Sequence, residues 1–204
     1  MKKSTISHRM AVKAADTLNK YVPKEGVAYH KVVLGAEVWI MNISKMSIIF
    51  TIAWFLDVLF PALLIMGGFF ALRRTAFGVH ALTSTGCTIT SLVLMVAVPY
   101  FTWGFSVHRM VVVAVFALIF IAMWQYAPMD TAARPLVGAN KRKRLKRQSI
   151  IACLVMAVVL VINPFSEITF MLMIGAMYSA VLILPITYKV LKREIANYER
   201  YEFG

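Results

Sequence analysis

The chain has 204 residues, of which 60% are hydrophobic and only 15% are charged, and its formal net charge is +13. Soluble domains are about 45–50% apolar and about 25% charged, so this composition excludes an ordinary soluble fold. The basic residues lie between the apolar blocks, which is the distribution that the positive-inside rule produces in membrane proteins. Nucleic-acid binding is therefore not needed to explain the charge.

Three apolar blocks, residues 110–129, 148–166 and 168–188, contain no Asp, Glu, Lys or Arg. Each is close to the ~20 residues that a helix needs to cross ~30 Å of hydrocarbon. Because lipid offers no hydrogen-bond partners, the backbone must satisfy itself within each segment, as a helix does. The sequence therefore predicts an all-α, polytopic integral membrane protein.

The first 37 residues differ from the rest. Ile6, Met10, Val12 and Leu18 are spaced for one helical face, and lysines lie on the others. This pattern predicts an amphipathic helix on the membrane surface, attracted to anionic lipids. The first twenty residues lack the apolar core of a cleaved signal peptide.

The stretch from Met46 to Leu72 has Asp57 as its only charged residue. It fits either one tilted helix or two helices that turn near Asp57–Pro61. Proline ends helices, which favours two. The glycine-bearing stretch Leu59–Leu72 is short, so a re-entrant or strongly tilted element stays open there. The two-helix choice predicts about six crossings, near residues 38–58, 59–74, 85–103, 109–127, 149–164 and 168–188.

Six crossings place both termini on the cytoplasmic side and leave Arg109 as the only Lys or Arg outside. The predicted organisation is a surface region over residues 1–37, a membrane domain over 38–190 and a cytoplasmic tail over 191–204. Gly175, Ala176, Ser179 and Ala180 on the last span are small residues of the kind that permit close helix packing.

The segment from Arg73 to Cys87 combines two arginines, a histidine and a cysteine at the inner mouth of a predicted span. An imidazole such as His80 can deprotonate a thiol and make it a good nucleophile. If Ser84 or Thr85 caps the next helix, Cys87 falls in its first turn, where unpaired N–H groups stabilise a thiolate and could hold an oxyanion. The other cysteine, Cys153, lies in an apolar run and is expected to pack as a small hydrophobe.

Spacing limits this hypothesis. In an unbroken helix His80 and Cys87 would lie ~10 Å apart along the axis, too far for a hydrogen bond of ~3 Å. Direct pairing needs a bend or unwound turn, for which Ser84, Thr85 and Gly86 are suitable. Otherwise a second subunit would have to complete the site.

The same segment resembles the signature of the accessory gene regulator B (AgrB) family of membrane endopeptidases, which process autoinducer peptide precursors in bacterial quorum sensing. That signature is an arginine-rich start, Gly-Gly-x-His, six residues and Cys. Here Gly78-Val79-His80 and the gap to Cys87 fit, but Phe77 stands where the first glycine is usual. The resemblance covers roughly residues 25–190 and includes three further segments: Asn42–Lys45, Ala127–Leu136 and Lys141–Arg147.

The resemblance implies a cysteine endopeptidase (a thiol protease) that cleaves an AgrD-like precursor and promotes its cyclisation to a thiolactone or lactone. Cys87 would be the nucleophile and His80 the general base, with Gly78, Ser84, Thr85 and Gly86 supporting the turn and the oxyanion. It also implies a homodimer in the bacterial cell membrane, an active site on the cytoplasmic side, and no metal or organic cofactor.

The basic residues near this site have three interpretations. The first is topology with attraction to anionic lipids. The second is binding of an acidic part of the precursor. Nucleic-acid binding is the third, and it lacks the aromatic interleaving that single-stranded partners favour. The residues concerned are Arg73, Arg74, Lys141, Arg142, Lys143, Arg144, Lys146 and Arg147.

Two other functions stay open. A small peptide transporter or exporter would be expected to carry charges deep in several spans or an internal repeat. A non-catalytic membrane scaffold would not depend on Cys87.

Overall fold

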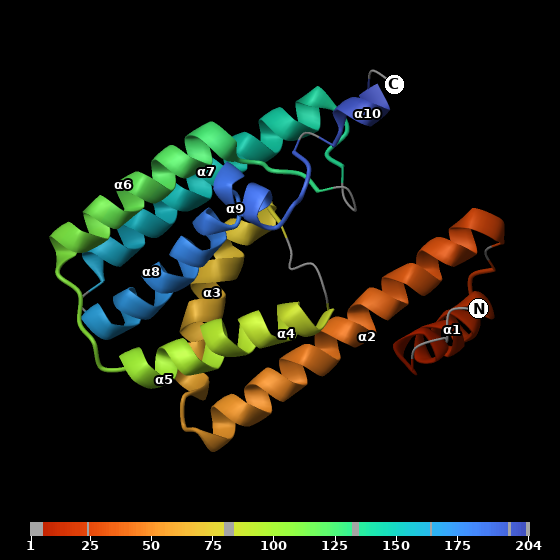
Figure 1. Cartoon of the computed structure of the whole chain (residues 1–204), viewed down its shortest axis with the longest axis horizontal. Coiled ribbons are helices and arrows are strands. Elements are labelled where there is room, and N and C mark those ends of the chain that lie inside the picture. Colours follow the sequence, from red (N-terminus) through yellow and green to blue (C-terminus); the bar gives the residue numbers. More distant parts are fainter. Residues whose placement is uncertain are drawn as a thin grey trace. The chain divides into compact units, whose positions relative to one another are not determined.

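The computed structural model describes residues 6–23, 25–79, 84–131, 135–163, 165–195 and 197–202. These residues form helices joined by short connections (Figure 1), which confirms the predicted all-α class. The chain forms two compact units, Met1–Ile52 and Ala53–Gly204.

The first unit holds helix α1 (Ile6–Asn19) and most of α2 (Gly26–Phe55). The two helices pack through the small residues Ala11, Ala15 and Val33, which are buried. Met10 and Leu18, on the face expected to meet lipid, are exposed. Helix α2 begins at Gly26 rather than at Val38, so the predicted start of the first span lies inside a longer helix.

Helix α2 ends at Phe55 and α3 begins at Leu59 and ends at Ala76. Asp57 between them has a positive φ of 55°, a conformation that stops a right-handed helix. Pro61 lies in the first turn of α3, where a missing N–H costs no intrahelical bond. The prediction of two helices rather than one tilted helix is confirmed.

The next apolar stretch is a helix from Thr85 to Thr102 whose middle is wound differently. It comprises α4 (Ser84–Leu92), the π-helical turn η1 (Val93–Ala97) and α5 (Val98–Thr102). Pro99 has no N–H for the carbonyl four residues earlier, and a π-turn is one way in which a helix absorbs such a defect.

The second unit is built around α3, α6 (Arg109–Tyr126), α7 (Ala139–Ile162) and α8 (Ser166–Val181). Helix α6 packs on α7 and α8, and α3 packs on α8 and α7 (Figure 1). Gly68 and Gly175 make the crossing of α3 and α8 very close. A Cβ on Gly175 would stand 2.0 Å from the carbonyl oxygen of Ile65, so only glycine fits.

This crossing uses the small-residue face of α8. Ala176, Ser179 and Ala180 are buried within the chain, beside the glycine contact with α3. The close packing that these residues were expected to permit therefore takes place inside one molecule.

The last predicted span, residues 168–188, is wrong as a single helix. Helix α8 ends at Val181, and the short α9 (Pro185–Val190) follows. Pro185 cannot donate to the Val181 carbonyl, and it biases the residue before it toward extended backbone. Leu184 is extended accordingly, with ψ 138°. The Thr187 hydroxyl donates to the Val181 carbonyl instead, at 2.6 Å.

Among the described residues, five helices are long and apolar enough to cross a membrane: α2, α3, the Thr85–Thr102 helix, α6 and α7. Helix α8 is apolar but has 16 residues, or roughly 24 Å at ~1.5 Å per residue. The described residues therefore confirm a polytopic α-helical membrane protein with five helices of spanning length, and a sixth crossing by α8 stays a prediction.

Candidate active site

The end of α3 turns sharply into an extended segment, Phe77–Val79, that leads toward His80. Phe77 has φ 58° and ψ −131°, and Gly78 has φ 106°. Both conformations favour glycine. The segment therefore breaks the helix between Arg73 and Cys87, as pairing of His80 with Cys87 requires.

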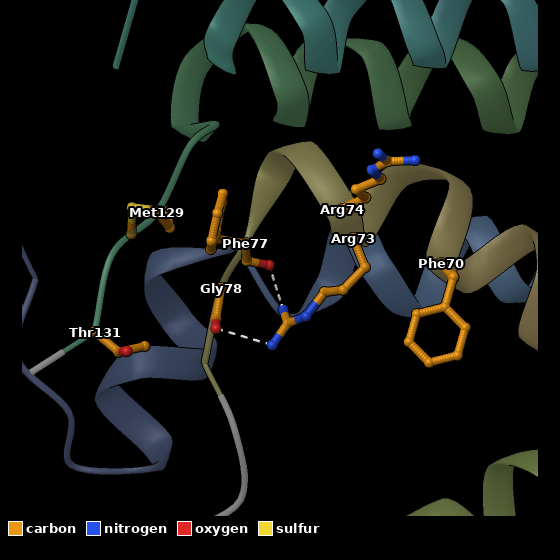
Figure 2. A pocket seen from close by; sticks show the side chains of 7 residues that line it. All are labelled: Phe70, Arg73, Arg74, Phe77, Gly78, Met129 and Thr131. Carbon is orange, nitrogen blue, oxygen red and sulfur yellow. Dashed lines mark hydrogen bonds between the residues drawn. The ribbon is translucent and has the colours of Figure 1, made fainter. Parts of the chain in front are cut away.

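Arg73 holds this segment from the last turn of α3. Its guanidinium donates to the carbonyl oxygens of Phe77 and Gly78 (2.8 Å), as Figure 2 shows. It also donates to the Val79 carbonyl oxygen at 2.7 Å. The residue is only 8% exposed. A planar group with five donors in a fixed fork suits several carbonyls at once. Arg73, predicted to bind substrate, is thus engaged with its own chain.

Two other parts of the chain hold the same segment through the backbone. The Gly78 N–H donates to the Met129 carbonyl, and the Met129 N–H donates to the Ala76 carbonyl, each at 3.0 Å. The Val79 N–H donates to the Leu182 carbonyl at 3.1 Å. Leu182 can accept this bond because the break before Pro185 ends the helix there.

Gly78 cannot be replaced in this arrangement. A Cβ there would stand 2.5 Å from Nη1 of Arg73 and 2.7 Å from the Leu182 carbonyl oxygen. The predicted role of Gly78 in the local turn has this physical basis: it admits both the arginine clamp and the backbone bond.

A pocket of about 450 Å³ opens beside the segment. Figure 2 shows Arg73 and Arg74 pointing in different directions from α3, with Arg74 directed away from the clamped carbonyls. Arg74 is exposed, so its charge is available to a ligand. The pocket is lined by Phe70, Arg73, Arg74, Phe77, Gly78, Met129 and Thr131.

Cys87 is the fourth residue of α4, in its first turn, and it is a free, half-buried thiol. Cys153 is also free but fully buried, as predicted for a packing residue. The two cysteines thus differ in access to reactants.

His80 lies outside the described residues, so its predicted role as general base stays a prediction. Ser84, Thr85 and Gly86 were expected to form the unwound turn; they begin α4 instead. The break occurs earlier, at Phe77–Val79. This difference arises because backbone bonds to the distant residues Met129 and Leu182 hold Phe77–Val79 in an extended conformation, and the local sequence does not reveal them.

The basic run of α7 lies in the first turns of that helix, and its members have different surroundings. Lys146 lies 6.0 Å from the Trp124 ring centroid in a cation–π contact. Arg142 forms an ion pair with Glu202, so part of the predicted substrate-binding set is already occupied. The exposed members are Lys141, Lys143, Arg144 and Arg147.

The C-terminal segment, residues 197–202 with helix α10 (Glu199–Glu202), is anchored next to this region. Arg142 contacts Glu202 at 2.7 Å and stacks over the Tyr198 ring at 3.8 Å from its centroid. Bonds from Arg142 and from the Gly138 N–H lower the pKa of Glu202 below its usual 4.5. Figure 1 shows α10 beside the start of α7.

Asp130 is the residue that sequence reasoning missed. It is 4% exposed, and its carboxylate accepts from the backbone N–H groups of Asn197 (3.1 Å) and Tyr198 (2.8 Å). The Tyr188 hydroxyl donates to its carbonyl oxygen at 2.9 Å. The available signal in the sequence was an acidic residue directly after a long apolar span. An acid in that position can become buried, and a buried carboxylate needs hydrogen-bond partners.

The fold and the site together define a class: a polytopic α-helical membrane protein with a free thiol in the first turn of one helix and a hydrogen-bonded turn at the end of the preceding one. The model of the accessory gene regulator B family matches residues 10–187. The chain belongs to this family, and the membership supports a role in the agr quorum-sensing system.

Curated relatives agree with this assignment. A protein from Clostridium acetobutylicum named as AgrB-like is 34% identical over 98% of this chain and 96% of its own length. One from Listeria innocua, also named as AgrB-like, is 35% identical over 85% of each chain. The accessory gene regulator protein B of Staphylococcus carnosus is 28% identical over 76% of this chain and 81% of its own. No solved structure matches the chain significantly.

Proposed function

We propose that this protein is a cysteine endopeptidase that cleaves an AgrD-like precursor peptide, with Cys87 as nucleophile and His80 as general base. The observation that carries the proposal is the clamped segment Phe77–Val79. It breaks the helix and fixes the chain on the residue before His80, while Cys87 opens the next helix as a free thiol. Fixed geometry is what a nucleophile–base pair needs.

The reaction proceeds in two acyl transfers. His80 takes the proton of Cys87, the thiolate attacks a peptide carbonyl of the precursor, and His80 passes the proton to the departing amine. The product is a thioester on Cys87 and a released C-terminal tail. A cysteine or serine of the precursor then attacks this thioester and closes a thiolactone or lactone ring, and the proton returns to Cys87.

The energetics of these steps differ. Exchange of one thioester for another is nearly balanced, whereas forming a thioester from an amide is uphill. The forward direction therefore depends on removal of the released tail or of the cyclic product. N–H groups in the first turn of α4, with Ser84, Thr85 and Gly86, are suited to hold the oxyanion of each tetrahedral intermediate.

Two arginines have separate roles in this proposal. Arg73 is a positioning residue, because its donors are directed to the chain's own carbonyls. Arg74 borders the pocket and is free to meet an acidic group of the precursor.

The exposed basic residues of α7 attract the precursor or anionic lipid. Raising the salt concentration should weaken precursor binding; an affinity that does not respond to salt would remove this role.

The proposed setting is the bacterial cell membrane, with both termini and the active site on the cytoplasmic side and the protein as a homodimer. The positive-inside distribution supports the orientation. Arg73, Arg74 and the α7 run would share the side of the Cys87 thiol, where a membrane-bound precursor is accessible.

The test is precursor cleavage by protein reconstituted in lipid, measured by product mass. Cys87→Ala and His80→Ala should each abolish cleavage. Cys153→Ala is the matched control, since it removes the other free thiol, and it should cleave like the wild type. Full cleavage by either active-site variant would end the proposal and favour a transporter or scaffold.

A further inference from the structure

A second pocket, of about 410 Å³, lies at the opposite end of α6 from Met129. Helices α6 and α8 begin there and α7 ends there (Figure 1). Helix α6 has 18 residues, so its two ends are roughly 27 Å apart. This is close to the ~30 Å thickness of the hydrocarbon core, which puts the pocket at the headgroup level of the other membrane surface.

Hydrogen-bond donors dominate the polar lining. His108 accepts from the Met110 N–H through Nδ1 at 3.3 Å, so the hydrogen of a neutral imidazole is on Nε2. Asn163 accepts from the Phe165 N–H through Oδ1 at 3.1 Å, which leaves its NH₂ group as donor. Arg109 adds a positive charge to the lining.

Two helix N-termini converge on the same pocket, one beginning at Arg109 and the other at Ser166. The N–H groups of Met110, Val111 and Val112 donate to His108, so these termini act on a ligand mainly through the partial positive charge at the start of each helix. An anion is the ligand that such termini favour. Glu167, the acid in the first turn of α8, is exposed and is not among the lining residues.

An independent observation points to a ligand. Thr169 lines the pocket and is only 3% exposed, and its hydroxyl oxygen has no hydrogen-bond partner. Its backbone N–H is satisfied by the Phe165 carbonyl at 3.0 Å. A buried hydroxyl without a partner is unfavourable, and a bound ligand that accepts its proton would relieve this.

We propose that this pocket binds a phosphate group, carried by an anionic phospholipid headgroup or as free phosphate. The guanidinium of Arg109, the donors of His108 and Asn163 and the Thr169 hydroxyl surround the phosphate oxygens. The site is separate from Cys87, so binding there does not depend on the peptidase reaction.

The experiment measures thermal unfolding of the full chain in uncharged detergent. One arm titrates phosphatidylglycerol against phosphatidylcholine, and the other titrates inorganic phosphate. Phosphatidylglycerol should raise the unfolding midpoint, and phosphatidylcholine should not. Stabilisation by phosphatidylglycerol alone identifies a headgroup site, and stabilisation by both phosphatidylglycerol and phosphate identifies a site for phosphate itself. Either pattern supports the proposal only with the variant results that follow.

Variants localise the effect. In Arg109→Gln, the ligand concentration that gives half of the full rise in unfolding midpoint should be about tenfold higher, as expected for the loss of one charge-assisted hydrogen bond. In Thr169→Val, the same concentration should be about fivefold higher, as expected for the loss of one hydrogen bond from a neutral donor. Ser179→Ala removes another buried hydroxyl without a partner, and Lys189→Gln removes one charge elsewhere; both should respond like the wild type. An unchanged response in Arg109→Gln and Thr169→Val, or no response of the wild type, would overturn the proposal.

Discussion

Two arginines each hold a segment of this chain, in opposite environments. Arg73 is buried and bonds to neutral carbonyls of Phe77–Val79. Arg142 is about one-fifth exposed and pairs with the Glu202 carboxylate. A buried clamp on carbonyls has no partner that titrates, whereas a partly exposed ion pair responds to salt and pH. The comparison indicates that the bonds on Phe77–Val79 do not depend on pH or salt, whereas the ion pair on the C-terminal segment depends on both.

The largest effect should come from Gly78→Ala. The added Cβ meets Arg73 and Leu182 at a positive φ, so the clamp must open, at a cost of at least about 2 kcal/mol. Precursor cleavage should be lost and the unfolding temperature should fall. Gly104→Ala is the control, because φ is +91° there but nothing lies within 4 Å of a Cβ. Equal losses in both variants would contradict the clamp.

Arg73→Lys should come next. A lysine keeps the charge but replaces the planar fork by a single ammonium, so the segment before His80 loses its fixed position. We expect kcat for precursor cleavage to fall on the order of 100-fold with KM little changed. Arg74→Lys should retain kcat and change KM. A pure KM effect in Arg73→Lys would show that Arg73 binds substrate instead.

A smaller effect tests the strain at Phe77. Phe77→Gly and Phe77→Ala remove the same ring, but only glycine accepts the observed φ of 58° freely. The glycine variant should therefore unfold at a higher temperature, with a difference in stability of about 1 kcal/mol. If the alanine variant is equally stable, the backbone at this position carries no strain.

The smallest effect concerns the ion pair between Arg142 and Glu202. Because Arg142 and the Gly138 N–H lower the pKa of Glu202 in the folded state, its stabilisation is present above pH 4.5 and is lost as pH falls through the lowered value. The wild type should lose thermal stability in that acidic range. Glu202→Gln should show a flatter profile there, and a profile parallel to the wild type would exclude Glu202 as the cause.

Much of the fold follows from hydrophobic block length. The apolar blocks exceed the length of a soluble core helix, and lipid forces each of them to be helical. The break near Asp57 was also predictable, because a charged residue and Pro61 interrupt an apolar stretch. The break before Pro185 was missed, although the same proline rule applies, because the uncharged block around it has the length of a complete span.

The features of the candidate site likewise fall into those that the sequence predicts and those that only tertiary contacts decide. Residue chemistry, the H-x6-C spacing and the family resemblance together predict Cys87 as the nucleophile, and direct pairing with His80 requires a helix break before it. The place of that break, the inward turn of Arg73 and the buried Asp130 were decided by contacts with Met129, Leu182 and residues 197–198. Such contacts join segments from 50 to more than 100 positions apart, and no local pattern encodes them.

The sequence by itself determined the helical membrane class, since that depends only on the lengths of apolar runs and the placement of charge. Only the tertiary structure decided that Arg73 serves the chain's own backbone while Arg74 remains exposed. Neighbouring arginines are chemically identical, and they differ only in which carbonyls the folded chain brings within reach of each.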